Sequence, residues 1–311
     1  MASMILLRRV LRRISFGWIV TMLCLVFVLI RFLHREYVPV AKNDTGPFPI
    51  LQYLNITFNK DVWDNLHLYK FSMNTDICNG GTRVVVIVHS ALYNAQKRQK
   101  IRKDTSGRGS IHESLLAVVF LVGETNNASL QADVERESQK YHDIVQGNFI
   151  DSYQNLTHKH IMGYHWVINH CNNVLYVIKI DDDVVLHVKN VLIHLLLNPF
   201  TQEHIMCVVL NGGQKETTGK WIISEEEYPF VRYPQYCAGF AYITTLSVIK
   251  RLYAASTYIK SIWIDDVYAT GLVALASNTT LIGFPSGQYY NGLEYPPARY
   301  QTEGMFVLYR D

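Results

Sequence analysis

The chain has 311 residues, of which 49% are hydrophobic and 18% are charged, and its formal net charge at pH 7 is +3. A chain of this length and apolar content can bury a large core, which excludes an intrinsically disordered protein. Basic residues are scattered apart from the N-terminus and residues 97–103, so no nucleic-acid-binding surface is indicated.

The N-terminal residues predict a membrane anchor. Residues 14–33 form an apolar segment that is about long enough to cross a thin bilayer at ~1.5 Å per residue. Arginines at positions 8, 9, 12 and 13 precede it, so the positive-inside rule places residues 1–13 in the cytoplasm and the rest of the chain in the lumen. A cleaved signal peptide is the alternative, but a good small-x-small cleavage site is lacking. Because the span is short, we expect a single-pass type II protein of the Golgi membrane.

Glycan acceptor motifs agree with a lumenal location. Asn-x-Ser/Thr motifs predict N-glycosylation at Asn43, Asn55, Asn127 and Asn278. Asn155 also begins such a motif, but it directly precedes a predicted helix, and we expect it to be the N-cap of that helix instead.

Outside the anchor the chain has an even number of cysteines, which can form disulfides in an oxidising compartment. They are Cys78, Cys171, Cys207 and Cys237, and every possible connectivity remains open. Buried free thiols are the alternative. A zinc site is not indicated, because the sequence has no C-x-x-C pair.

Residues 34–80 are predicted to be a lumenal stem, because they contain several prolines and little periodicity. Residues 81–311 are predicted to form one α/β domain with a mixed, mainly parallel sheet, because short β-branched runs alternate with helix-like segments. Strands are expected at 84–89, 116–122, 174–180, 205–210 and 221–223, and helices at 96–103, 129–142, 155–171, 247–255 and 265–276. The histidines of the helix at 155–171 (His158, His160, His165 and His170) are expected to have packing or surface roles.

A triple aspartate follows the predicted strand at 174–180. The carboxyl ends of strands in open α/β sheets are where ligands bind. In an extended segment, residues i and i+2 project to the same side, so Asp181 and Asp183 can face one cleft while Asp182 points away. Paired carboxylates suit Mn²⁺ or Mg²⁺, which bind the diphosphate of a nucleotide. The alternative is an ordinary acidic turn or helix cap.

A second acidic pair, Asp265-Asp266, opens the predicted helix at 265–276. Stabilisation by the helix dipole is a sufficient reason for carboxylates there. The functional alternative is a general base that removes the proton of an acceptor hydroxyl.

Ordered sequence blocks between residues 82 and 283 resemble one known family. Residues 98–105 resemble R-x-x-I-R-x-T-W, residues 143–159 resemble D-I-I-Q-x-D-F-x-D-S-Y-x-N-L-T-x-K, and residues 179–183 resemble K-x-D-D-D. Residues 220–221, 227–229, 233–239 and 265–268 resemble K-W, E-Y-P, Y-P-x-Y-C-x-G and E-D-V-Y. In this order and spacing, the blocks resemble the inverting β-1,3-galactosyltransferase family, which also includes β-1,3-N-acetylglucosaminyltransferases.

The resemblance implies a glycosyltransferase catalytic domain of the GT-A kind, a UDP-sugar donor and a Mn²⁺ or Mg²⁺ cofactor. It implies that Asp183 is the direct metal ligand, that Asp181 serves both ribose and cation, and that Asp266 is the base. The residues that it places at the donor nucleotide are Arg98, Arg102, Asp151, Lys159, Asp181 and Asp182. Those that it places at the acceptor and donor pocket are Trp221, Tyr236, Gly239 and Asp265.

The chain departs from the family pattern at several positions. Ser106 stands where the family has Trp, Asp265 replaces Glu, and Phe240 follows the Y-P-x-Y-C-x-G block where the family often has Gly. The family also commonly supplies a C-terminal His to the metal, but the chain has no His after His204. Water, or a side chain such as Tyr290 or Asn291, would have to take its place.

We therefore expect a type II membrane enzyme that transfers a hexose, with galactose as the leading donor sugar, in β-1,3 linkage to the glycan of a glycoprotein or glycolipid. UDP-GlcNAc or UDP-GalNAc is the alternative donor. A catalytically silent relative that acts as a partner or chaperone is the alternative from another class, and a carboxylate-pair hydrolase is a weaker one. A homo-oligomer is compatible with the sequence.

Overall fold

The computed structural model describes residues 69–105, 115–200, 203–216, 218–285, 289–291 and 307–309. In these ranges no helix is both long enough and apolar enough to cross a membrane. The predicted cytoplasmic tail, the anchor, most of the predicted stem, Asn43, Asn55 and Ser106 lie outside the described residues.

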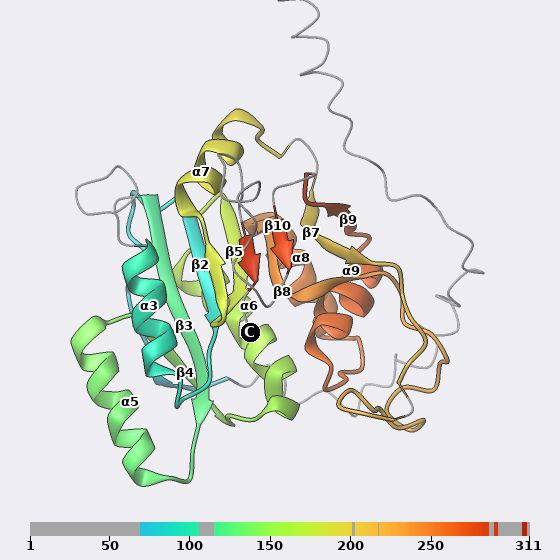
Figure 1. Cartoon of the computed structure of the whole chain (residues 1–311), viewed down its shortest axis with the longest axis horizontal. Coiled ribbons are helices and arrows are strands. Elements are labelled where there is room, and N and C mark those ends of the chain that lie inside the picture. Colours follow the sequence, from blue (N-terminus) through green and yellow to red (C-terminus); the bar gives the residue numbers. More distant parts are fainter. Residues whose placement is uncertain are drawn as a thin grey trace, which may run out of the picture. The chain divides into compact units, whose positions relative to one another are not determined.

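A large mixed sheet forms the centre of the folded unit (Figure 1). Its order is β1-β4-β3-β2-β5-β8-β7-β9. Parallel pairs join β2 to β3, β2 to β5, β3 to β4 and β7 to β9, while β1–β4, β5–β8 and β7–β8 are antiparallel. The predicted mixed, mainly parallel sheet is confirmed. The strands are β1 (Phe71–Met73), β2 (Val84–His89), β3 (Leu116–Glu124), β4 (Ile144–Ile150), β5 (Tyr176–Asp181), β7 (His204–Leu210), β8 (Tyr236–Thr245) and β9 (Thr280–Gly283).

The centre of the sheet is buried on both faces. All residues of β2 are buried, and the side chains are β-branched from Val84 to Val88. This composition is typical of a parallel strand that is covered by helices on both sides. Because β2, β3 and β5 run in the same direction, their carboxyl ends meet at one edge, where His89 pairs with Leu121 and with Asp181.

Helices α3 and α5 lie beside β2, β3 and β4, and α8 and α9 lie beside β7 and β8 (Figure 1). The helices predicted from periodicity are present, and α7 is an additional one. They are α3 (Ala95–Thr105), α5 (Ala128–Tyr141), α6 (Leu156–His170), α7 (Val188–Leu197) and α8 (Leu246–Ser256). The last predicted helix begins at Asp265 and continues as a π-helical segment, η3 (Val267–Leu272), and as α9 (Val273–Ala276). π-Helical segments are rare and are often found at functional sites.

The predicted strand at 221–223 is wrong. These residues form a turn and an irregular segment, in which the side chains of Trp221 and Ile222 are 46% and 53% exposed. An apolar triplet without alternation carries little information about a strand, and here its large side chains lie at the rim of a pocket.

Asn155 stands at the N-cap position of α6, as predicted, but its side chain makes no capping bond. A 3-10 turn, η2 (Tyr153–Asn155), runs directly into α6. The Asn155 Nδ2 donates to the Ile150 carbonyl at 2.8 Å. Asn127 is a genuine cap, because its Oδ1 accepts from the backbone N–H of Ser129 and Leu130. Asn127 and Asn278, both predicted glycan acceptors, are exposed.

A small second sheet follows the triple aspartate. It consists of β6 (Val184–Leu186), β11 (Val307–Tyr309) and β10 (Tyr289–Asn291), in the order β10-β11-β6. Val184 pairs with Tyr309, and Tyr309 pairs with Asn291. The register therefore brings the backbone of Asn291 level with Val184, the residue after Asp183.

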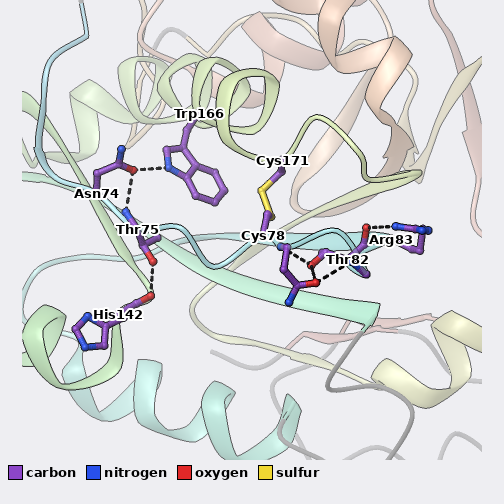
Figure 2. Close-up of a disulfide and its surroundings, with 10 residues drawn as sticks. Asn74, Thr75, Cys78, Thr82, Arg83, His142, Trp166 and Cys171 are labelled. Carbon is purple, nitrogen blue, oxygen red and sulfur yellow. Dashed lines mark hydrogen bonds between the residues drawn. A yellow bond between two sulfur atoms is a disulfide. The ribbon is translucent and has the colours of Figure 1, made fainter.

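Two disulfides select one of the possible cysteine connectivities. Cys78 is bonded to Cys171 and Cys207 to Cys237, with Cα–Cα distances of 5.3 and 5.6 Å. The first disulfide joins the segment before β2 to the end of α6 (Figure 2). The second joins β7 to β8, next to the pocket described below.

The end of the predicted stem is part of the folded unit. Strand β1 pairs with β4, and the buried Trp166 donates from Nε1 to Asn74 Oδ1 at 2.7 Å (Figure 2). The Thr75 hydroxyl donates to the His142 carbonyl, also drawn in Figure 2. Together with the Cys78 disulfide, these contacts fasten residues 71–78 to the sheet and to α6.

The contact between Asn74 and Trp166 gives a stability prediction. Asn74→Ala leaves a buried indole N–H without its acceptor, so the free energy of unfolding should fall by about 1–3 kcal/mol. Urea unfolding followed by tryptophan fluorescence measures it. Asn169→Ala, which changes an exposed amide on α6, is the control and should alter the free energy of unfolding by less than about 0.5 kcal/mol. Equal losses in the two variants would contradict the assignment.

Candidate active site

A pocket of about 500 Å³ opens where β5, β8 and the helix that begins at Asp265 converge. Ligand sites of globular proteins are concave and have few convergent polar groups, and this pocket has both properties. The residues predicted for catalysis, the cation and the acceptor that line it are Asp181, Trp221, Tyr236, Gly239, Asp265 and Asp266. Phe240, one of the departures from the family pattern, lines it too.

The triple aspartate is divided between the pocket and the interior. Asp181 ends β5, and its Oδ1 lies 2.5 Å from Lys179 Nζ. The buried Lys179 also donates to the Gly239 carbonyl. Burial alone would lower the pKa of Lys179, but the charges of Asp181 and Asp265 raise it, so it stays protonated. The pocket thus contains the protonated ammonium group of Lys179 beside the carboxylates of Asp181 and Asp265.

Asp182 points away from the pocket, as the strand geometry predicted. Its Oδ2 accepts from Ser90 Oγ and Asn94 Nδ2, both at 2.8 Å, and its Oδ1 lies 3.3 Å from Lys97 Nζ. Asp182 therefore holds the loop between β2 and α3. Its contact with the donor nucleotide, which the family resemblance implies, stays a prediction.

Asp183 has a carboxylate oxygen that lacks a partner. Its Oδ1 is buried and makes no hydrogen bond within the described part of the chain. Burial raises the pKa of Asp183. A buried carboxylate oxygen is costly without a compensating donor or cation, so this atom suits a hard divalent ion. Asp183 lies outside the set of residues that line the 500 Å³ pocket.

Asp266 lies at the N-terminus of the last helix. Its Oδ1 accepts from the Val267 N–H at 2.8 Å, and its Oδ2 is so close to Gly239 that a Cβ there would lie 3.2 Å from it. Burial, followed by the charge of Asp265, raises the pKa of Asp266 to about 7. A carboxylate with this pKa can take a proton near neutral pH.

Asp265 has the opposite electrostatic environment. Burial alone would raise its pKa, but a 2.9 Å hydrogen bond with His160 Nδ1 and the charge of Lys179 lower it. His160 Nε2 in turn lies 2.8 Å from the Tyr242 hydroxyl. Neighbouring carboxylates whose pKa values are pushed apart are typical of acid–base sites.

Sequence reasoning missed the histidines beside Asp265. His89 Nδ1 lies 3.8 Å from Asp265 Oδ2, and the rings of His89 and His160 are perpendicular with centroids 4.8 Å apart. These three residues each bring one possible metal-ligand atom within 4.8 Å of the others. Burial lowers the pKa of both histidines, so each is neutral. The only sequence signal was the unusual number of histidines in α6, which carries no information about partners 105 residues away.

Arg98, predicted at the diphosphate, is part of the interior. Its side chain is fully buried and donates to Glu137 at 2.5 and 2.9 Å. The remaining donors bind Ser90 Oγ and the carbonyls of Ala91 and Leu92. All N–H groups of the guanidinium are thereby used, and none is available to a phosphate.

Arg102, Asp151 and Lys159, also predicted at the nucleotide, do not line the 500 Å³ pocket. Arg102 pairs with Asp143 at 2.7 Å, and its Cζ lies 4.0 Å from the centre of the Tyr141 ring. Lys159 Nζ lies 2.9 Å from Asp151 Oδ1 and donates to the Ser90 carbonyl at 2.6 Å. With Arg98 and Asp182, the Lys159–Asp151 pair fixes the loop 90–94 at the carboxyl end of β2.

Comparison with known proteins places these features in a family. A family model described as Galactosyltransferase matches residues 96–282. Beta-1,3-galactosyltransferase 1 of Homo sapiens is 34% identical over 210 residues, which are 66% of this chain and 64% of that protein. Beta-1,3-galactosyltransferase brn of Drosophila melanogaster is 33% identical over 205 residues, which are 64% of this chain and 62% of that protein. The chain thus matches a little under two thirds of the length of these relatives.

Among solved structures, the apo structure of the bifunctional glycosyltransferase WbbM superposes with a TM-score of 0.42 and 10% sequence identity. The superposition covers 74% of this chain and 46% of that one.

Proposed function

The chain belongs to the β-1,3-galactosyltransferase family, and we propose that it transfers galactose from UDP-galactose, with inversion, to a hydroxyl group of a glycan acceptor in β-1,3 linkage. The observation that carries the proposal is Asp266, a carboxylate with a pKa of about 7 in the same pocket as Asp181. Membership of the family supports galactosyl transfer in general. We propose in addition a GT-A kind of fold, UDP-galactose as the donor and a glycan as the acceptor.

The proposed chemistry is a single displacement. Asp266 accepts the proton of the acceptor hydroxyl while the hydroxyl oxygen forms a bond to C1 of the sugar. The bond from C1 to the UDP oxygen breaks on the opposite face, so the electron pair and the negative charge leave with UDP. Gly239 leaves room for the acceptor, since any side chain there would press against Asp266.

The residues Asp181 and Asp183 fit a divalent cation such as Mn²⁺ or Mg²⁺. The unpartnered Oδ1 of Asp183 supports this assignment. When bound, the cation would supply positive charge that stabilises the leaving diphosphate. Asn291, proposed in place of the missing C-terminal His, belongs to a strand whose register brings its backbone level with Val184. Lys179 orients Asp181 through the contact between its Nζ and Asp181 Oδ1.

The donor screen is the direct test. The full chain, purified in detergent, is incubated with Mn²⁺, a panel of UDP-sugars and a panel of glycans, and the product linkage is determined. Transfer of galactose in β-1,3 linkage is expected. Phe240 lines the pocket, so UDP-GlcNAc and UDP-GalNAc belong in the panel as the alternative donors. UDP release that does not depend on Asp266 would defeat the proposal, and the absence of UDP release with every donor would favour a silent relative.

We also place the enzyme in the Golgi membrane with its catalytic part in the lumen. The apolar segment 14–33 and the disulfides, which need an oxidising compartment, support this placement. Protease protection of the catalytic part in intact microsomes is the expected result.

The pKa of Asp266 predicts an acid limb in the activity profile. A base works only when deprotonated, so kcat should fall about tenfold per pH unit below pH ~7 and level off above it. Initial rates at saturating substrates and constant ionic strength, between about pH 5 and pH 9, measure the profile. Asp265→Asn removes the neighbouring charge and should move the limb to lower pH. A flat profile from about pH 5.5 to 8 would contradict the assignment of Asp266.

A further inference from the structure

Two histidines and an aspartate form a cluster where three elements meet. His89 is the last residue of β2, His160 lies in α6, and Asp265 stands directly before Asp266. Each of the three offers one possible metal-ligand atom, and these atoms lie within 4.8 Å of one another. The proposed transfer reaction uses neither histidine, so the cluster needs an explanation of its own.

His89 is a buried imidazole without a hydrogen bond. Neither nitrogen of its ring is hydrogen-bonded to another residue in the described part of the chain, and Nε2 is buried. Its Nδ1 lies 3.8 Å from Asp265 Oδ2, which is too far for a hydrogen bond. A buried polar group without a partner costs free energy. A metal ion bound between Nδ1 and the carboxylate would satisfy both atoms.

The distances within the cluster fit a zinc ion. Zn²⁺ binds nitrogen at ~2.0–2.1 Å and carboxylate oxygen at ~2.0–2.2 Å, so two ligand atoms of a tetrahedral site lie about 3.3–3.5 Å apart. In the cluster, Asp265 Oδ2 lies 2.9 Å from His160 Nδ1 and 3.8 Å from His89 Nδ1. These distances lie on either side of the ideal one, so only small side-chain shifts are needed to bind the ion.

The ring of His160 is oriented as that of a metal ligand. Its Nε2 lies 2.8 Å from the Tyr242 hydroxyl and 3.2 Å from the Tyr164 hydroxyl, and its Nδ1 is directed toward Asp265. A metal-bound histidine commonly donates its other ring N–H to a fixed partner, which sets the tautomer and the orientation of the ring. His160 and both tyrosines are buried, so this arrangement is preorganised.

The pocket gives the cluster an entry path and a favourable charge. His89 and Asp265 line the pocket, so water can occupy a remaining coordination position. Lys179 is the one lysine among the described residues that line it. The carboxylates that line it are those of Asp181, Glu216, Asp265 and Asp266. This excess of negative charge attracts a divalent cation.

The ligand types separate the cluster from the triple aspartate. Two imidazole nitrogens and one carboxylate favour Zn²⁺, whereas oxygen-only ligands favour Mn²⁺ or Mg²⁺. Asp181 lines the same pocket but is not one of the three residues, and its Oδ1 contacts Lys179 Nζ. Asp265 is also one of the positions at which this chain departs from the family pattern.

We propose that His89, His160 and Asp265 bind Zn²⁺, with water from the pocket in the remaining coordination position. The site does not rest on the proposed transfer reaction, because no step of that reaction involves the histidines. Binding of the ion requires neither UDP nor an acceptor, so it can be measured without them.

Zinc titration of the full chain in detergent tests the site. The protein is treated with a chelator, freed of the chelator by dialysis, and titrated with Zn²⁺ by calorimetry in the absence of UDP. One Zn²⁺ per chain is expected, with a Kd of at most about 10 μM. X-ray absorption at the zinc edge of the loaded wild-type protein should show two imidazole ligands. Mn²⁺ at the same concentration should not displace the ion.

Variants of the ligands and of their neighbours identify the residues that bind. His89→Gln and His160→Gln each remove one ligand and should weaken Zn²⁺ binding by about 100-fold or more. Tyr242→Phe keeps all three ligands but removes the hydroxyl group beside His160 Nε2, so the affinity should fall by about tenfold. His158→Gln is the matched control, because His158 lies on the same helix outside the cluster. His158→Gln and Asp183→Asn should both leave the affinity for Zn²⁺ unchanged.

The outcomes that would overturn the site are distinct from those that concern sugar transfer. Absence of Zn²⁺ binding to the wild-type chain overturns it, as does binding that persists in both His89→Gln and His160→Gln. Loss of Zn²⁺ binding in Asp183→Asn would assign the ion to the triple aspartate instead. If a histidine variant does not fold, the X-ray absorption of the wild-type protein decides, because oxygen-only coordination contradicts the site. A chain that binds Zn²⁺ through the histidines but transfers no sugar would defeat the proposed function and leave the site intact.

Discussion

Asp266→Asn is expected to lower kcat by a factor of about 10²–10⁴ and to leave the fold intact. The asparagine Oδ1 can still accept from the Val267 N–H, so the start of the helix keeps its hydrogen bond. The amide cannot take a proton from the acceptor hydroxyl, and the transferred proton then has to go to water. Single-turnover rates with UDP-galactose and a competent acceptor measure the loss, and the remaining activity should lack the acid limb near pH 7.

Asp133→Asn is the control for this variant. Asp133 is exposed on α5, pairs with Arg136 on the same helix and does not line the pocket that contains Asp266. Its replacement should change kcat by less than about twofold, because exposed ion pairs contribute little. A wild-type rate in Asp266→Asn, with an unchanged pH profile, would exclude Asp266 as the base.

Asp183→Asn should have opposite effects on stability and on cation binding. Removing the charge from a buried, unpartnered oxygen should raise the melting temperature of the cation-free protein. The same change should abolish the increase in melting temperature that Mn²⁺ produces in the presence of UDP, and lower kcat/KM by about 10²–10³-fold. Differential scanning fluorimetry and steady-state rates at several Mn²⁺ concentrations measure both effects.

Asp182→Asn serves as the matched comparison, because it changes the neighbouring residue by the same few atoms. Asp182 accepts from Ser90 and Asn94, so its replacement should lower the melting temperature with or without Mn²⁺. The Mn²⁺-induced increase should persist in that variant. Should Asp183→Asn keep its response to Mn²⁺, the cation must bind elsewhere, and the cluster of His89, His160 and Asp265 becomes the position to examine.

The parts of the site that lie on one strand or helix could be predicted from the sequence. The burial of β5 follows from its apolar residues, and the alternation of an extended chain separates Asp182 from Asp181. Asp265 and Asp266 open a helix as their position before an apolar segment indicates. These inferences need only the geometry of a single strand or helix, which the order of apolar and polar residues along the sequence indicates.

The partners of charged side chains could not be predicted in the same way. The family resemblance around Arg98 and Arg102 implies guanidinium groups at the donor nucleotide, but not the carboxylates of Glu137 and Asp143 that bind them. Those carboxylates come from α5 and from the residue before β4, and only the fold brings them close to the arginines. His160 is a similar case, because its partner Asp265 lies on a segment that joins α6 only through tertiary packing.

Exposed apolar residues explain why the predicted strand at 221–223 is wrong. Trp221 and Ile222 were assigned to a strand because apolar residues usually enter a core. Here Trp221 is partly exposed and lines the pocket instead of joining the sheet. A periodicity argument cannot separate these cases, since both place large apolar side chains in a short run.

The small sheet has a consequence for how the protein is made. The turn that carries Asp183 leads into β6, and β6 pairs with residues 307–309, so this pairing joins segments more than a hundred residues apart. The ribosome has to translate through residue 309, and those residues have to emerge from the ribosome, before β6 gains this neighbour. The large sheet can assemble from earlier residues, because its last strand ends at Gly283. The nascent chain can therefore complete its main scaffold first, and the border of the proposed cation site closes only after residues 307–309 have been made.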